Sequence, residues 1–335
     1  MTDVADMKLG RELEPELERF RVELTGYSYR MLGSSHDAED AVQETMVRAW
    51  RNIEKFEGRS SLRSWLYRIA TNVCLTMLES RGRRARPMDF GAPGTPEPSS
   101  LGEPTGEATW LQPVPDALVV PAGGDPAELA VARETIKLAF VAALQHLPAR
   151  QRAVLILREV LQWSAAETAE LLGSTVASVN SALQRARATL GAHAEALDGP
   201  PAEVGPQEQE LIDRYADAFQ RYDMNALVAL LHEDAVLSMP PYALWLRGTD
   251  DIVAWHLGPG AACRGSRLVP VMVNGQPGFG QYKPDPETGG FAAWSLSIPE
   301  IQDGKIVRLN AFLDCPHLFP VFGLPLTLEE AEPAS

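Results

Sequence analysis

A chain of 335 residues with 45% apolar content is long enough for two or three domains with buried cores. No apolar run approaches the roughly 18 residues of a membrane span, and the acidic N-terminus lacks the apolar stretch of a signal peptide. The three cysteines, Cys74, Cys263 and Cys315, are far apart and form no metal-binding cluster, which argues against a disulfide framework or a zinc site. We therefore expect a cytoplasmic protein with no membrane contact, and nothing in the sequence indicates a cofactor.

The net charge of −15 is unusual for a protein that binds nucleic acid, but its distribution along the chain is uneven. Residues 1–90 and 125–195 are each neutral, whereas residues 91–124 hold four acids and no base, and residues 196–335 carry −11. Residues 42–90 hold ten bases against five acids. A local basic face for phosphates is therefore available in the first third of the chain.

Apolar periodicity divides the chain into helical and non-helical parts. Residues 10–86 and 125–195 show the spacing of amphipathic helices. Between them, residues 87–124 are rich in Pro, Gly and acids, and such a composition predicts a linker that cannot order itself. A second Gly/Pro break comes before residues 207–326, the last predicted domain.

The last domain is predicted to be α+β. A helix is expected from about Gln209 to Leu231, and short strand-like runs follow at 235–239, 268–274, 290–298 and 305–312. Asp303-Gly304 lies between two apolar runs, which is a hairpin signal. The predicted fold class is thus multidomain: two all-α modules and one α+β domain.

Residues 164–190 carry the pattern of a helix-turn-helix. Ser164 and Glu167 form a capping box that opens a short helix, Gly173 supplies a turn, and Thr175 can cap a longer second helix. In such a motif the second helix enters the major groove. A helical hairpin packed in a core, with its arginines solvated, is the alternative. The residues expected to face DNA are Ser174, Thr175, Ser178, Ser181, Arg185 and Arg187.

Residues 37–86 hold three further patterns. An acidic stripe with a glutamine runs along a predicted helix, and spacing alone favours a solvated face. After it, a loop rich in Gly and Ser precedes Trp65, Tyr67 and several arginines, a combination that suits single-stranded DNA. Trp65 and Tyr67 could instead be core residues, and the helical spacing makes one of them so. Arg81, Arg83, Arg84 and Arg86 then either match a helix dipole or grip phosphate.

Two long motifs resemble the sigma-70 family, in its extracytoplasmic-function (ECF) group. The residues of 37–50 and 61–72 are similar to region 2 of these sigma factors, and those of 147–187 to region 4. The resemblance implies a factor that binds RNA polymerase core, recognises and melts promoters to initiate transcription, and is not itself an enzyme. Its partners would be the beta-prime clamp helices, the beta flap and promoter DNA.

The resemblance also implies residue roles. Core binding would fall to Asp37, Asp40, Gln43, Glu44 and Arg48. Region 2 would capture and follow the opened minus-ten DNA with Arg59, Ser60, Ser61, Arg63, Trp65, Arg68, Asn72, Arg81, Arg83 and Arg84. The second helix of the helix-turn-helix would read the minus-35 element. That helix has Asn180 and Ala182 where many members carry bases, which reduces counterion release and weakens sequence-independent affinity.

The last 140 residues or so resemble the SnoaL-like domain, a cone-shaped α+β barrel with an interior pocket. The residues that carry the resemblance include 223–231, 239–241, 245–248 and 303–306. The candidate acid–base groups, which no spacing joins into a dyad, are His232, Asp234, His256, Asp314 and His317. We expect no catalysis here, but a regulator that contacts the sigma modules within the chain.

A cyclase or isomerase with a DNA-binding appendage is the alternative function. The long region 2 motif argues against it, because such an enzyme has no use for a polymerase-gripping face.

Overall fold

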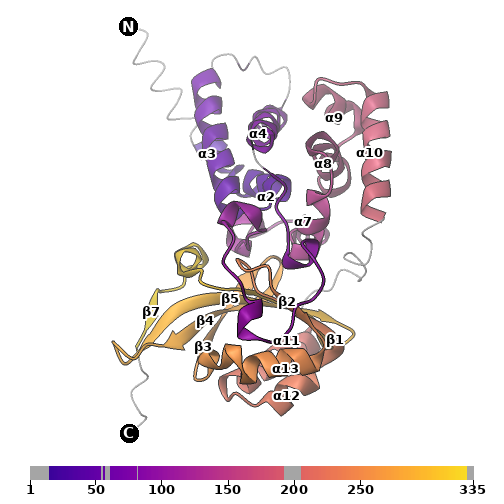
Figure 1. The fold of residues 1–335 in the computed structure, drawn as a ribbon. Helices are drawn as coiled ribbons and strands as arrows, with labels where there is room; N and C mark the ends of the chain where they lie inside the picture. The colour runs from indigo at the N-terminus through magenta and orange to yellow at the C-terminus, as the bar shows by residue number, and fades with distance from the viewer. Residues whose placement is uncertain (1–14, 54–55, 57–60, 81, 192–204, 330–335) are drawn as a thin grey trace. The chain divides into compact units, whose positions relative to one another are not determined.

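The computed structural model describes residues 15–53, 56, 61–80, 82–191 and 205–329 (Figure 1). The chain divides into two compact units. The first joins Met1–Arg84 to Leu111–Pro201, and the second joins Ala85–Trp110 to Ala202–Ser335. A segment between the two sigma-like motifs therefore belongs to the same unit as the C-terminal domain.

The described part of the first unit is all-helical, as predicted. Ser34 and Ser61 cap α3 and α4 by accepting hydrogen bonds from the backbone N–H groups of Asp37 and Ser64, both at 3.1 Å. The helices are α2 (Arg21–Leu32), α3 (Ser35–Asn52), α4 (Leu62–Glu79), α5 (Asp116–Val119), α6 (Pro126–Glu134), α7 (Leu138–Gln145), α8 (Ala149–Leu155), α9 (Ala165–Leu171) and α10 (Val176–Gly191).

One apolar core runs through both sigma-like modules. From the first module, Tyr27, Leu66 and Tyr67 are fully buried in it, and from the second, Leu144 and Ile156. The rings of Tyr67 on α4 and Trp163, just before α9, lie 5.2 Å apart. The two modules, which the sequence places on either side of a linker, therefore pack as one body in this structure.

A buried arginine joins the same two modules. Arg152 of α8 donates to the backbone carbonyl of Met31 in α2, to the side-chain Oε1 of Gln145 at 2.7 Å and to the carbonyl of Leu147 at 3.2 Å. Burial lowers the pKa of this guanidinium to about 10, so it remains charged at neutral pH. A buried cation needs such acceptors, and one of them lies in the other module.

The predicted linker is more ordered than its composition suggests. Leu111, Val114 and Val119 are buried against Tyr29 and Ile136 in the first unit. The apolar residues of this stretch have neither helical nor strand spacing, so periodicity did not identify them. Leu111 and Val114 bury individually in a non-helical, Pro-rich stretch, and Val119 buries at the end of the short helix α5.

Residues 85–110 are held by the C-terminal domain. The N–H of Gly94 donates to the carbonyl of Trp245 at 2.8 Å, and the N–H of Thr105 donates to the carbonyl of Pro241 at 2.8 Å. The indole of Trp245 returns a hydrogen bond to the carbonyl of Gly91 at 3.0 Å. Leu101 packs against the domain's core. The expectation of a linker without order of its own is thus corrected for this half.

The C-terminal domain is a mixed sheet with helices against it, which confirms the predicted α+β class. The strand order is β2-β1-β6-β5-β4-β3, with β7 on β5, and only the β1–β6 pair is parallel. Figure 1 shows the three helices of this domain together on one face of the sheet. The elements are α11 (Pro206–Gln220), α12 (Met224–Leu230), β1 (Leu231–Ser238), β2 (Trp245–Arg247), α13 (Thr249–Leu257), β3 (Arg267–Val273), β4 (Gln276–Pro284), β5 (Phe291–Gln302), β6 (Lys305–Phe312) and β7 (Thr327–Leu328).

The predicted hairpin is confirmed, and a second was missed. Asp303 and Gly304 both have positive φ, at 51° and 71°, and join β5 to β6 in a two-residue turn. Asn274 and Gly275 do the same between β3 and β4. β4 begins Gln-Pro-Gly and lacks strand propensity, so it was not predicted. The expected single helix is divided into α11 and α12, because Asp223 caps a new helix by accepting from the N–H of Ala226 at 3.0 Å.

Candidate nucleic-acid and polymerase interfaces

The acidic stripe lies on the exposed face of α3. Asp40, Gln43 and Glu44 are all exposed. Glu44 also pairs with Arg48, one turn further along, at 2.6 Å. The side chains form a row because positions three and four residues apart share a helix face. This row is a charged surface that a partner with basic side chains can recognise.

Asp37 is not part of this exposed row, which corrects the prediction. Its carboxylate accepts a hydrogen bond from the Arg84 guanidinium at 2.6 Å, and both side chains are at most 7% exposed. Arg84, predicted to hold DNA, is therefore not on the surface either. The pair ties the start of α3 to the chain beyond α4. Both residues serve the fold here, because breaking a buried pair leaves an uncompensated charge.

A groove between α3 and α4 brings predicted residues of both kinds together. It has a volume of about 330 Å³ and is lined by Arg48, Asn52, Trp65, Ile69 and Asn72. Asn52 and Ile69 were not among the predicted site residues, because helical spacing marks Ile69 only as an apolar core position and nothing marks Asn52. An aromatic ring, a guanidinium and two amides are the groups that can stack on and hydrogen-bond to an unpaired base.

The structure separates the roles of the two aromatic candidates. Tyr67 is fully buried, and its hydroxyl is 3.5 Å from the Glu23 carboxylate. Trp65 is only partly buried, and its ring lies 5.2 Å from that of Phe56 at the groove. Tyr67 is thus the core residue, whereas Trp65 packs against the core with part of its ring still accessible.

Several arginines predicted to contact DNA have partners within the first unit. Arg63 pairs with Glu23 at 3.0 Å and lies over the rings of Tyr67 and Trp163. Arg68 of α4 pairs with Glu170 of α9 at 3.3 Å. These contacts occupy both guanidinium groups in this arrangement of the modules.

Of the other region 2 residues predicted to contact DNA, the structure describes some and leaves others outside the described residues. Ser61 is exposed at the start of α4, and Arg83 hydrogen-bonds to the ring of His146 at 2.7 Å. Arg59, Ser60 and Arg81 lie outside the described residues.

The helix-turn-helix has the predicted local chemistry. The capping box is present: the N–H of Glu167 donates to the Ser164 hydroxyl at 3.2 Å, and the N–H of Ser164 donates to the Glu167 carboxylate at 2.8 Å. Gly173 has a φ of 58°, the left-handed turn that favours glycine. Thr175 caps α10 by accepting from the N–H of Ser178 at 3.2 Å. The sequence therefore predicted this motif and its boundaries.

The two arginines of α10 lie on different faces. Arg185 is seven residues after Ser178, so at about 100° per residue the two are within roughly 20° of each other. Arg187 is nine residues after Ser178, roughly on the opposite side of the helix, and pairs with Glu159 at 2.5 Å. Ser181 shares the face of Ser178 and Arg185, and Ser174 lies in the turn before the helix; both are exposed. The structure groups Arg185, and not Arg187, with the polar recognition face.

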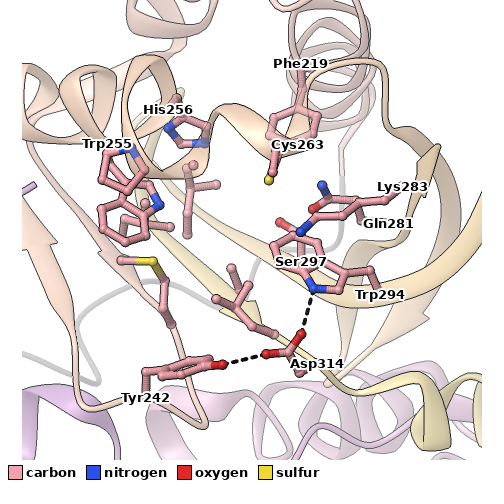
Figure 2. A pocket seen from close by; sticks show the side chains of 18 of the residues that line it. Phe219, Tyr242, Trp255, His256, Cys263, Gln281, Lys283, Trp294, Ser297 and Asp314 are labelled. Carbon is pink, nitrogen blue, oxygen red and sulfur yellow. Dashed lines mark hydrogen bonds between the residues drawn. The ribbon is translucent and has the colours of Figure 1, made fainter. Parts of the chain in front are cut away.

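The C-terminal domain contains a cavity of about 260 Å³. Of the five candidate acid–base residues, only His256 and Asp314 line it (Figure 2). His232 and Asp234 are exposed on β1, where Asp234 pairs with Arg247 at 3.3 Å. His317 lies 3.2 Å from Glu107. Glu107 belongs to residues 85–110, the segment that the C-terminal domain holds, which we call the docked segment.

The sequence matches three family descriptions in the predicted order. They are Sigma-70 region 2 over residues 17–84, Sigma-70 region 4 over residues 137–190, and the SnoaL-like domain over residues 212–309. No helix in the described part of the chain has the length and apolarity that a membrane span requires. Two sigma regions in this order define a transcription initiation factor.

Relatives that match over most of their own length show the family to which the chain belongs. The chain is 44% identical to the ECF RNA polymerase sigma factor SigG of Mycobacterium tuberculosis, over 97% of this chain and 86% of the relative. It is 28% identical to SigJ of the same organism, over 95% of this chain and 96% of SigJ. The crystal structure of SigJ shares the fold, with a TM-score of 0.59 over 93% of this chain and 99% of that chain, at 24% identity. The chain belongs to the ECF RNA polymerase sigma factors, and the alternative of a stand-alone enzyme is not supported.

The different faces of the two α10 arginines give a paired test. Arg185→Ala should weaken promoter binding roughly evenly across sequences and lower the salt dependence by about one counterion, as the loss of a phosphate contact does. Arg187→Ala, which removes the same charge from the opposite face, should change affinity less than about twofold. Fluorescence anisotropy with polymerase holoenzyme over a salt series measures both. Equal losses for the two variants would contradict the assignment of faces.

Proposed function

We propose that the two sigma modules divide promoter recognition between three surfaces of the first unit. The stripe of Asp40, Gln43 and Glu44 binds the beta-prime clamp helices. The groove around Trp65 holds an unpaired base of the minus-ten element. The Ser178–Arg185 face of α10 reads the minus-35 element, while region 4 contacts the beta flap. The chain acts in the cytoplasm, where core polymerase and promoters are found.

The observation that carries the proposal furthest is the shared core of the two modules. The elements that they would read are roughly 25 base pairs apart, about 85 Å at 3.4 Å per base pair. A compact body the size of the first unit has a radius of gyration of about 16 Å. The closed arrangement cannot contact both elements at once. It therefore represents a resting form that opens when the factor engages polymerase and promoter.

The contacts that must break are those between the modules. Arg68–Glu170 is an exposed pair, worth about 1 kcal/mol or less. Arg152 is buried and loses its Met31 acceptor on opening. The rings of Tyr67 and Trp163 separate as well. Opening also breaks the Arg68–Glu170 pair, so the event that separates the modules frees the Arg68 guanidinium for DNA phosphate.

The C-terminal domain is placed to influence this opening. It holds residues 85–110 through the backbone bonds of Gly94 and Thr105, while the chain on both sides, at Arg84 and Leu111, is buried in the first unit. A short covalent connection also keeps its effective concentration near the sigma modules at about millimolar. We propose that the domain is a built-in regulator and not a second enzyme. The alternative is that its charge of −11 only keeps it soluble.

The acidic stripe can be tested by reversing its charge. Asp40→Lys with Glu44→Lys should abolish co-purification with core polymerase, because basic partner groups would then meet like charge. Glu210→Lys with Asp213→Lys makes the same net change at two exposed positions of α11 and serves as the control. Circular dichroism confirms folding of both variants. Retained core binding by the folded stripe variant would reject the assignment.

The regulatory role can be tested by truncation. Residues 1–198 and the full chain should differ at least threefold, roughly, in run-off transcription at equal occupancy of core, since an intramolecular contact at about millimolar effective concentration is removed. Loss of output would identify a supporting domain and gain of output an inhibitory one. Equal output from both forms would leave the domain with no role in initiation.

A further inference from the structure

The cavity of the C-terminal domain has polar groups on two sides and a largely apolar lining. Figure 2 shows Trp255 and His256 on one side of it, and Lys283 and Trp294 on the other. The lining includes the apolar residues Phe219, Leu237, Met239, Leu309 and Leu313, and the polar residues Gln281 and Ser297. An engineered apolar cavity of about 150 Å³ binds benzene. A cavity of about 260 Å³ therefore suits a ligand of one or two fused rings.

One end of the cavity presents a cation. The Lys283 ammonium lies 3.1 Å from the centre of the Trp294 ring, and it makes no hydrogen bond or ion pair with any residue that the structure describes. Burial lowers the pKa of this lysine, but nearby negative groups, among them Asp314, oppose the shift. An ammonium has three donors and no acceptor, so it requires an acceptor from a ligand or from water.

The carboxylate of Asp314 makes no hydrogen bond or ion pair with this ammonium, and accepts from two other side chains instead. One oxygen accepts from the indole N–H of Trp294 at 2.8 Å, and the other accepts from the hydroxyl of Tyr242 at 2.6 Å (Figure 2). The same hydrogen bond raises the pKa of Tyr242 to about 12, which keeps the hydroxyl a donor. Asp314 thus orients the indole ring of Trp294, over which the Lys283 ammonium lies.

The other end presents an acceptor. The Nδ1 of His256 is 2.7 Å from the carbonyl of Ile252, and since a carbonyl only accepts, this nitrogen carries the proton. Burial lowers the pKa of His256, so the ring is neutral at pH 7. Its Nε2 is then a lone-pair acceptor with no partner among the described residues. A ligand hydroxyl can donate to it.

The lining of the cavity includes a residue that comes from the segment between the two sigma modules. Leu101 of the docked segment lines the cavity together with Tyr242 and Asp314. The Gly94 and Thr105 hydrogen bonds flank Leu101 on both sides and attach the segment to the strand β2 and to Pro241. A molecule in the cavity would contact the segment that leads to the first sigma module.

We propose that this cavity binds a small aromatic hydroxy acid, with its carboxylate on Lys283 and its hydroxyl on His256, and that the bound molecule stabilises the docked segment through Leu101. The inference rests on the proposed regulatory role only for its effect on transcription. Binding itself requires only the cavity. Ligand occupancy and segment docking are then linked, because each makes the other more favourable.

The test uses the full chain and fluorine NMR with 3-fluoro-4-hydroxybenzoate as the probe, because its carboxylate and hydroxyl lie at opposite ends of the ring. Saturable binding is expected, and 3-fluoro-4-hydroxybenzamide, which lacks the charge, should bind about tenfold more weakly or worse. Lys283→Met should cause a similar loss. Lys305→Met removes the same charge from an exposed position of β6 and should bind as the unmodified chain does. Circular dichroism and the dispersion of amide signals confirm that each variant is folded.

The coupling between ligand binding and docking of the segment is measured separately, by hydrogen exchange. Hydrogen exchange at the amides of Gly94 and Thr105 should slow by about threefold or more when the cavity is saturated, because occupancy and docking are coupled. Binding without that slowing would overturn the linkage. Equal binding of acid and amide, equal binding by Lys283→Met and Lys305→Met, or no binding of the acid would overturn the ligand class. None of these outcomes depends on transcription, so they are distinct from a failure of the truncation test.

Discussion

The burial of Arg152 between the two sigma modules is the contact on which the closed form depends. Its guanidinium lies among apolar side chains and reaches a carbonyl of α2 from α8. A charge in such a place is stable only while every acceptor remains in position. The surrounding aromatic and aliphatic residues, including Tyr67 and Leu157, then form one core. Separating the modules exposes this core and leaves Arg152 to find new acceptors or water.

If only the open form is active, the activity of the factor depends on the fraction of molecules in the open form. The closed and open forms have the same sequence and differ in the burial between the modules, and a partner shifts the balance only by its differential affinity for the open form. In the proposed account, core polymerase supplies such a preference by binding both modules at separate places. The proposed second influence on the same balance is the C-terminal domain, because it holds residues 85–110 between the two modules.

Local signals in the sequence predicted the local structure well. The capping box at Ser164, the cap at Thr175 and the Asp303-Gly304 turn each depend on neighbours within a few residues, and each is present. Long-range contacts were beyond such signals. Asp37 and Arg84 are 47 residues apart, and nothing in helical periodicity says that they meet in the interior. The prediction that both arginines of α10 face DNA did not consider that Arg185 and Arg187 lie on different faces of the helix.

The same limit explains the predicted linker. Its composition correctly excludes long helices and strands, but a few isolated apolar residues, Leu101, Leu111 and Val114 among them, anchor it to two different bodies. The cavity was expected from the resemblance. His256 and Asp314 were candidates from the sequence, but Lys283 and Trp294 were not, since they come from β4 and β5 and are brought to His256 of α13 only by the fold.

The distance between the two sigma modules tests this account most directly. Cysteines replacing Glu16 and Arg187 are exposed and lie outside the proposed interfaces, while Cys74, Cys263 and Cys315 are buried and will label slowly. Spin labels at the two sites should give a single short distance in the free protein. In the complex with core polymerase and promoter, the distance should increase by tens of ångströms, as elements about 85 Å apart require. An unchanged distance in an active complex would contradict the account.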